Sequence, residues 1–283
     1  MKKIFKGVLT QEKGNTFLVG TGGRRLLATE LIWSGYLTHW IGKVVFARYL
    51  PQRDYEREEP IVIMRPHRRE AEVPSVGLYF NERLPKYRAS FFGHIAVDVD
   101  GEVFNFSHLL NENEVMTREE YFYRPALGEF APHPETGRFD TGNANRPYYD
   151  KFGRLFMRSV HVLRIEGLKT GRLSEIYHNM LRRIHSAPPD PRRPEKYKGF
   201  NVLTRNCATL IRDGLRRYGF PQIRGILPRE LFLCTVYHFR KLEKKGALKT
   251  ALIKMKQLKV PEAPYSAGVP ILNPINRVRQ RKL

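Results

Sequence analysis

The segment FFGHIAVDVDGEVFNFS (residues 91–107) predicts two adjacent strands joined by a tight turn. Apolar residues lie on both sides of Asp100-Gly101, a pair that favours a two-residue hairpin loop because both positions accept positive φ. Side chains alternate between the two faces of a strand. With this loop, His94 on the first strand and Asn105 on the second therefore lie on the same face of the hairpin.

A four-residue loop would shift the pairing by two residues and place Asn105 directly opposite His94, so either loop keeps the two on one face. Gly93 precedes His94, and a glycine inside a strand is typical of a bulge or a close backbone approach. Taken alone, His94 is most simply a half-buried histidine that hydrogen-bonds to its neighbours. The nearby Asn105 and a cysteine further along the chain favour a functional role.

That cysteine opens the segment TRNCATLIRDGLRRYGF (204–220), which predicts an amphipathic helix. Its apolar residues recur at helical spacing from 210 to 218. Gly219 is a natural C-cap, and Pro221 prevents the helix from continuing. The segment therefore predicts a helix that begins near Cys207 and ends before Gly219.

Asn206, or alternatively Thr204, is the expected N-cap, which places Cys207 in the first turn. There the unpaired backbone N–H groups and the helix dipole stabilise a thiolate, and the same N–H groups can donate to an oxyanion. The alternative is a buried structural thiol on the core side of the helix. Cys234 lies inside an apolar run, LFLCTVY, and is expected to be structural.

The composition predicts a folded, strongly basic protein. The chain has 283 residues, of which 41% are hydrophobic, and its net charge of +22 favours a polyanionic partner. Two cysteines exclude a disulfide framework and a multi-cysteine zinc site, and no HExxH motif occurs. We therefore expect neither a metal nor a cofactor.

The chain divides by pattern into three parts. Residues 1–66 contain five short strand patterns, which predict a small all-β, barrel-like module. Residues 75–228 mix strands and helices and carry an insertion rich in aromatic residues at 113–155. Residues 229–283 are expected to be a basic, helical C-terminal extension followed by a tail.

The order of the motifs resembles the circularly permuted branch of the NlpC/P60 superfamily of papain-fold cysteine hydrolases, whose members include lecithin retinol acyltransferase-like proteins. That branch carries a strand histidine, a polar residue on the next strand and an Asn-Cys pair that opens a helix. Here the matching residues are His94, Asn105 and Cys207. The resemblance covers roughly 75–220 and implies an α+β fold, with an antiparallel sheet packed on the cysteine helix. Two features depart from it: the branch often has a second histidine where Asn105 stands, and the insertion lengthens the chain before the cysteine.

The resemblance implies a cysteine-dependent acyl hydrolase or acyltransferase. Cys207 would be the nucleophile, His94 the general base and Asn105 the residue that orients His94, with Asn206 capping the helix beside the oxyanion site. Attack on an acyl group would give a thioester intermediate. The first expected substrate is a lipid acyl ester, as in a phospholipase. An amide of peptidoglycan or protein is the alternative.

A second hypothesis is a non-enzymatic basic module that binds nucleic acid or a membrane. The lysines of 240–259 could lie on one helix with an apolar face, which suits an anionic membrane surface. No RNA-binding signature accompanies the arginines, so nucleic acid is the less favoured partner. The enzymatic hypothesis would suit an antibacterial effector with an inhibitory or immunity protein as its partner.

The N-terminal segment, MKKIFKGVLTQEKGN, starts with lysines but lacks the apolar stretch of a signal peptide. No run of eighteen apolar residues occurs in the chain, so no transmembrane helix is expected. We expect synthesis in the cytoplasm, with any export following a route other than the conventional secretory one.

Overall fold

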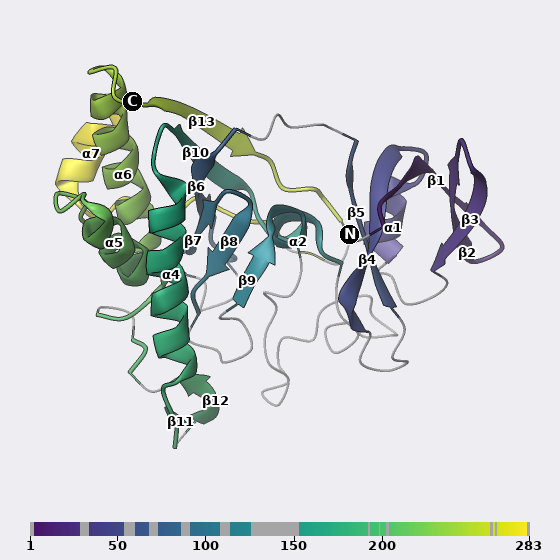
Figure 1. Cartoon of the computed structure of the whole chain (residues 1–283), viewed down its shortest axis with the longest axis horizontal. Coiled ribbons are helices and arrows are strands. Elements are labelled where there is room, and N and C mark those ends of the chain that lie inside the picture. The colour runs from purple at the N-terminus through teal and green to yellow at the C-terminus, as the bar shows by residue number, and fades with distance from the viewer. Residues whose placement is uncertain are drawn as a thin grey trace. The chain divides into compact units, whose positions relative to one another are not determined.

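The structure is a computed structural model in which the described residues form two compact units. It describes residues 3–28, 34–53, 60–67, 73–85, 91–107, 114–125, 153–191, 193–197, 199–201, 204–260, 263 and 265–281. The first unit comprises Met1–Ala71, Glu119–Met157 and Gln257–Tyr265. The second comprises Glu72–Arg118, Arg158–Lys256 and Ser266–Leu283. Each contains one large antiparallel sheet, so the fold is mixed α+β (Figure 1).

The five strands expected in the first part of the chain are confirmed, and they form one antiparallel sheet in the order β3-β2-β1-β4-β5. The strands are β1 (Phe5–Glu12), β2 (Asn15–Gly20), β3 (Gly23–Ala28), β4 (Val44–Arg53) and β5 (Pro60–Pro66). Among the described residues no pairing joins β3 to β5, so the strands form an open sheet and not a closed barrel.

The first unit also contains helices, which corrects the expectation of an all-β module. They are α1 (Ser34–Trp40), most of α2 (Arg118–Tyr123) and α3 (Arg154–Met157). Aromatic rings explain the association, because Tyr36 lies 5.1 Å from Phe156 and 6.1 Å from Trp40 between ring centroids. The predicted insertion (113–155) is thus divided between the units, because Glu114–Thr117 forms a strand of the second unit and the residues from Glu119 belong to the first. Its middle, 126–152, lies outside the described residues.

The second unit has a six-stranded antiparallel sheet in the order β13-β10-β6-β7-β8-β9. Its strands are β6 (Ser75–Asn81), β7 (His94–Val99), β8 (Glu102–Asn105), β9 (Glu114–Thr117), β10 (Val160–Glu166) and β13 (Lys249–Met255). A separate two-stranded ribbon consists of β11 (Pro189–Asp190) and β12 (Arg193–Tyr197).

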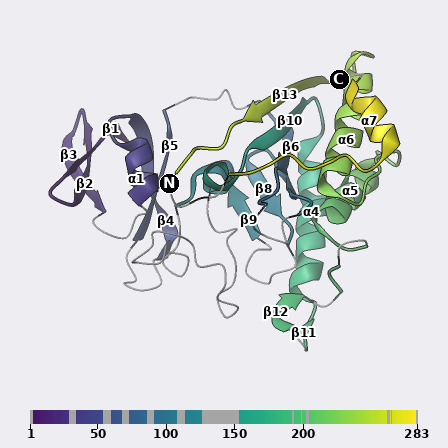
Figure 2. The same cartoon turned by 180° about the vertical axis from the view of Figure 1, so that it is seen from behind.

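Helices α4 (Thr170–His185), α5 (Cys207–Tyr218) and α6 (Pro228–Glu243) lie on one side of this sheet (Figures 1 and 2). Alternate strand residues fill the core beneath them, including Val76, Leu78, Phe80, Ile95, Val97, Val99, Phe104 and Phe106. The last helix, α7 (Pro274–Arg281), packs against α6. In the part of the chain described here, no helix has both the length and the apolar composition needed to cross a bilayer.

The structure contradicts the prediction that the lysine-rich segment 240–259 is a helix. Helix α6 ends at Glu243, the chain turns at Gly246, and β13 pairs along its whole length with β10. Glu243 fixes the turn, because its carboxylate accepts hydrogen bonds of 2.7 Å from both the backbone N–H and the hydroxyl of Thr250. Pairing with a distant strand therefore decides the conformation of 249–255, and this part of the expected extension belongs to the second unit.

The two-residue hairpin loop is confirmed, with Val99 opposite Glu102 and positive φ at Asp100 and Gly101. The carboxylate of Asp98, which is fully buried, holds the turn. It accepts hydrogen bonds from the Gly101 N–H at 2.7 Å, from Arg118 Nε at 2.6 Å and from the Tyr79 hydroxyl. Because each oxygen of this buried charge has a donor, removing the carboxylate leaves three donors without their acceptor.

We expect the substitution Asp98→Ala to lower the free energy of unfolding by about 3 kcal/mol, because it breaks a buried charged network. The matched control is Asp213→Ala, whose carboxylate is 40% exposed and pairs with Arg212 at 2.8 Å. That control is expected to cost less than about 1 kcal/mol. Far-UV circular dichroism during urea unfolding measures both, since α4, α5 and α6 lie in the second unit. Equal costs for the two variants would contradict the assignment.

Hydrogen bonds from Thr250 and an ion pair with Arg240 lower the pKa of Glu243 to about 2, from an ordinary value of 4.5. A lowered carboxylate pKa stabilises the folded state above pH 4.5, and the effect is lost as the pH falls toward 2. The Glu243→Gln variant should therefore melt below wild type at pH 6, and the gap should narrow as the pH falls to 3. A gap in melting temperature that stays constant over this range would contradict the prediction.

Candidate active site

His94 is the first residue of β7 and Asn105 is the last residue of β8, and the structure brings the two side chains together. His94 Nε2 lies 2.6 Å from Asn105 Oδ1. Both are buried, with 9% of His94 and 1% of Asn105 exposed. An amide oxygen can only accept, so Nε2 carries the proton in this pair and Nδ1 of the neutral ring holds a lone pair. The predicted shared face is confirmed, and the pair fixes the tautomer of His94.

Gly93 controls how the chain enters β7. Its φ is +72°, and a Cβ there would lie 2.4 Å from the carbonyl oxygen of Asn81. Asn81 is the β6 residue that pairs with His94. Only glycine fits this approach without moving the start of β7, so Gly93 helps to place the imidazole.

Helix α5 begins at Cys207 with a capping box, which confirms Asn206 as the N-cap in place of Thr204. The Asn206 side-chain oxygen accepts from the Thr209 N–H at 2.9 Å, and the Asn206 N–H donates to the Thr209 hydroxyl at 2.8 Å. These reciprocal bonds satisfy two backbone groups at the helix start. Cys207 therefore occupies the first position of a well-formed helix.

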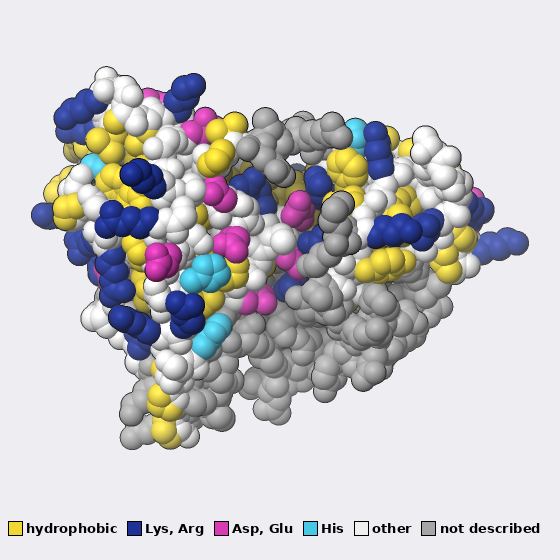
Figure 3. Space-filling view, viewed as in Figure 1, with side chains coloured by type: hydrophobic (Ala, Val, Ile, Leu, Met, Phe, Trp, Pro, Cys, Tyr) yellow, Lys and Arg dark blue, Asp and Glu magenta, His cyan; other side chains and the backbone are white. Residues whose placement is uncertain are grey.

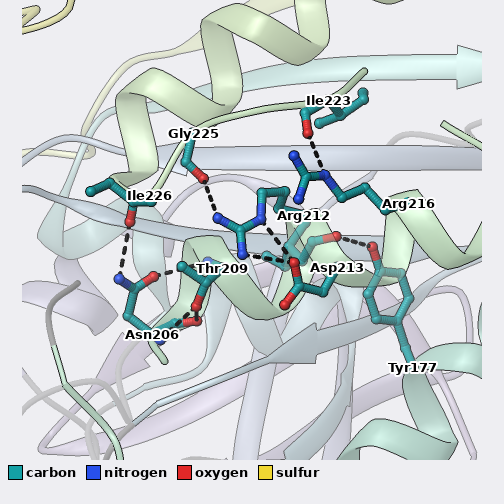
Figure 4. Close-up of polar contacts among 10 residues, drawn as sticks. Tyr177, Asn206, Thr209, Arg212, Asp213, Arg216, Ile223, Gly225 and Ile226 are labelled. Atoms are coloured by element: carbon teal, nitrogen blue, oxygen red, sulfur yellow. Dashed lines mark hydrogen bonds and ion pairs between the residues drawn. The ribbon is translucent and has the colours of Figure 1, made fainter. Parts of the chain in front are cut away.

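Side chains of α5 also hold the loop that follows the helix, as Figure 4 shows. Asn206 Nδ2 donates to the carbonyl oxygen of Ile226 at 3.0 Å, and Arg216 Nε donates to that of Ile223 at 2.9 Å. Arg212 adds a longer bond of 3.5 Å to the carbonyl oxygen of Gly225. Asn206 therefore both caps α5 and connects the start of the helix, through a hydrogen bond, to Ile226, twenty residues further along the chain.

Cys207 is half-buried and packs against the hydrophobic core of the second unit. Its helix contacts β7, the strand that carries His94. His94 and Asn105 alternate with the core residues Ile95 and Phe104, so their side chains leave the strands on the face opposite to that core. Alternation therefore places the imidazole and the helix that carries Cys207 on opposite faces of the sheet, so the structure brings together His94 and Asn105, and the meeting of Cys207 with them stays a prediction.

The second cysteine has a different environment. Cys234 lies on α6, is 3% exposed, and accepts a hydrogen bond of 3.3 Å from the backbone N–H of Arg224. This position agrees with the expectation that Cys234 packs in the core, and it makes Cys234 a natural control for Cys207.

Sequence reasoning missed a polar cluster around Glu82 in the second unit. Glu82 Oε1 lies 3.0 Å from His161 Nε2 and 3.2 Å from Lys254 Nζ, and the Ser266 hydroxyl donates to Oε2 at 3.0 Å. Burial acts to raise the pKa of Glu82, but these hydrogen bonds outweigh it and hold that pKa below its ordinary value. Burial lowers the pKa of His161, because desolvation outweighs the attraction of Glu82. Four distant segments meet here, and no local pattern marks them.

Among the described residues, no group of three or more histidine, cysteine or acidic side chains is arranged to hold a metal ion. Comparison of the chain with family models, with curated protein sequences and with the solved structures finds no match.

We expect Asn206→Ala to lower the free energy of unfolding by about 1 kcal/mol, because the variant loses the cap. Asn206→Asp keeps an acceptor for Thr209, so it should retain more stability than Asn206→Ala. Thermal unfolding followed by circular dichroism checks both.

The Asp variant also places a carboxylate beside Cys207, which disfavours a thiolate there. Alkylation of Cys207 by iodoacetamide at pH 7 should therefore be slower in Asn206→Asp than in wild type. Faster alkylation in this variant would argue against a thiolate stabilised at the helix start.

Proposed function

We propose that the chain is a cysteine-dependent acyl hydrolase or acyltransferase with a permuted papain-like catalytic domain. The observation that carries the proposal is the hydrogen bond between His94 Nε2 and Asn105 Oδ1, which leaves Nδ1 as the basic atom. The capped helix that begins at Cys207 supports it, as does the order of the strand histidine, the polar partner and the helix cysteine along the chain.

In the first step, the Cys207 thiol gives its proton to His94 Nδ1, and the sulfur attacks the carbonyl carbon of the substrate. The carbonyl oxygen becomes an oxyanion that accepts hydrogen bonds from backbone N–H groups of the first turn of α5. Asn105 keeps the imidazole in the required orientation and accepts from its Nε2–H throughout. The positive imidazolium and the helix dipole both favour the thiolate before attack.

In the second step, the tetrahedral intermediate collapses and the bond to the leaving group breaks. His94 returns its proton to the leaving oxygen or nitrogen, and Cys207 keeps the acyl group as a thioester. A water molecule then gives a proton to His94 and attacks the thioester, which releases the acid and restores the thiol. If another nucleophile takes the place of water, the same sequence is an acyl transfer.

An acyl ester of an anionic lipid is the first substrate class, and an amide of peptidoglycan or protein is the second. The net charge of +22 supports ranking the lipid ester first, because a strongly basic chain is attracted to anionic membrane surfaces. Figure 3 shows lysine and arginine side chains gathered over the helices of the second unit. Exposed members of this basic surface include Arg172, Arg182, Arg183, Arg216 and Arg217.

Incubation of the chain with phosphatidylglycerol vesicles and with peptidoglycan, followed by mass spectrometry, tests the proposal. We expect wild type to release a fatty acid or a cleaved peptide and Cys207→Ala to lose at least about a thousandfold of that activity, because the nucleophile is gone. Cys234→Ala is the matched control and should retain activity within about twofold, since that buried thiol has no part in the proposed reaction.

Substitutions of Asn105 test whether this residue orients His94 during the reaction. Asn105→Ala should slow turnover, whereas Asn105→His should restore a large part of it, since histidine can also accept from His94 Nε2–H. If wild type and Cys207→Ala give the same products, or if Cys234 reacts faster than Cys207 with iodoacetamide, the chain is not a cysteine hydrolase.

A further inference from the structure

A cavity of about 360 Å³ lies in the second unit between the loop that follows α5 and helix α7. Gln222, Arg224 and Gly225 line the loop side, and Asn273, Asn276 and Arg279 line the α7 side. No catalytic role assigned above uses these residues.

The loop side of the cavity has a fixed shape. The carbonyl oxygens of Ile223, Gly225 and Ile226 all accept hydrogen bonds from α5 side chains (Figure 4). Gly225 has a φ of +133°, and a Cβ there would lie 2.5 Å from the backbone nitrogen of Leu231. These carbonyl oxygens already accept from α5 and its N-cap, and Gln222 Nε2 lies 2.9 Å from His238 Nε2, so the positively charged side chain on this wall is Arg224.

The α7 side is anchored by Glu230, which is 6% exposed. One carboxylate oxygen accepts from the backbone N–H groups of Leu272 and Asn273 at 2.9 and 3.1 Å, and the other accepts from the side chain of Asn276. The buried carboxylate of Glu230 is therefore already engaged in holding α7 and the residues before it.

Two arginines bring positive charge to the cavity without a carboxylate to neutralise it. Within the described residues, no acidic side chain lies at ion-pair distance from the guanidinium of Arg224 or Arg279. Arg279 Nη1 donates to Asn276 Oδ1 at 2.8 Å, and its guanidinium lies 5.3 Å from the ring centroid of Tyr237. Both contacts are to neutral groups, so they orient the Arg279 guanidinium and leave its charge in place.

We propose that this cavity binds a phosphate group, carried either by a small phosphorylated molecule or by the headgroup of an anionic lipid. Guanidinium groups bind phosphate oxygens through paired, charge-assisted hydrogen bonds. Two arginines in one lining suit a tetrahedral group with several oxygens better than a planar carboxylate with two. The volume accommodates a small phosphorylated ligand. This proposal does not depend on the hydrolase proposal, because it requires neither Cys207 nor His94.

The test uses the full chain with Cys207→Ala as the background, so that no turnover can occur. Titration calorimetry with glycerol 3-phosphate measures the small-molecule arm. Co-sedimentation with phosphatidylcholine vesicles, with and without phosphatidylglycerol, measures the lipid arm. Saturable binding of glycerol 3-phosphate identifies a small ligand, and binding to phosphatidylglycerol vesicles alone identifies a lipid headgroup.

We expect the double variant Arg224→Gln/Arg279→Gln to weaken binding at least about tenfold, because each guanidinium contributes charge-assisted hydrogen bonds. The matched control is Lys6→Gln/Lys13→Gln, which removes the same charge from exposed positions of the first unit. The control should change binding less than about twofold if the cavity and not the overall charge binds the phosphate.

A third variant, Ile275→Glu, keeps the test decisive if the double variant does not fold. Ile275 also lines the cavity and is 61% exposed, so the change leaves the core intact and puts a carboxylate beside the two arginines. It should abolish binding of the same probe. Equal losses in the cavity variants and the control would overturn the proposal, as would the absence of binding to both glycerol 3-phosphate and phosphatidylglycerol vesicles.

Discussion

The geometry of the candidate site depends on one buried carboxylate. Asp98 lies on the same strand face as His94, and its bond to the Gly101 N–H fixes the two-residue turn. A slip of one residue in this hairpin would move every side chain of the second strand to the other face. Asn105 would then point into the hydrophobic core, and the hydrogen bond that sets the tautomer of His94 would be lost.

Helix α5 links the two sites described above. At its start, Asn206 caps the helix and donates a hydrogen bond to the carbonyl oxygen of Ile226. Further along, Arg216 holds the carbonyl oxygen of Ile223, so one helix presents Cys207 and shapes the wall that carries Arg224. A shift of this loop would therefore disturb the hydrogen bonds at the start of α5 as well as the shape of the cavity. Because the loop is held through backbone carbonyls, these contacts do not use the Arg224 side chain.

The basic charge of the chain is distributed between structural and exposed positions. Lys254 pairs with buried Glu82, and Arg118 pairs with buried Asp98, so both cations offset charges inside the second unit. The arginines over α4 and α5 face solvent, where their charge acts at a distance on anionic partners. This division explains how a net charge of +22 is compatible with a packed core.

The sequence by itself determined the features that local chemistry controls. Asp100-Gly101 predicted the turn, alternation put His94 and Asn105 on one face for either loop length, and the cap signal placed the start of α5 after Asn206 or Thr204, because positive φ and helix caps are properties of a few neighbouring residues. The five strands of the first unit were recognised for the same reason. Only the tertiary structure decided that 249–255 is a strand, because its partner β10 lies far away in the chain. The Glu82 cluster and the arginine-lined cavity likewise exist only where distant segments pack together, and no local pattern encodes that packing.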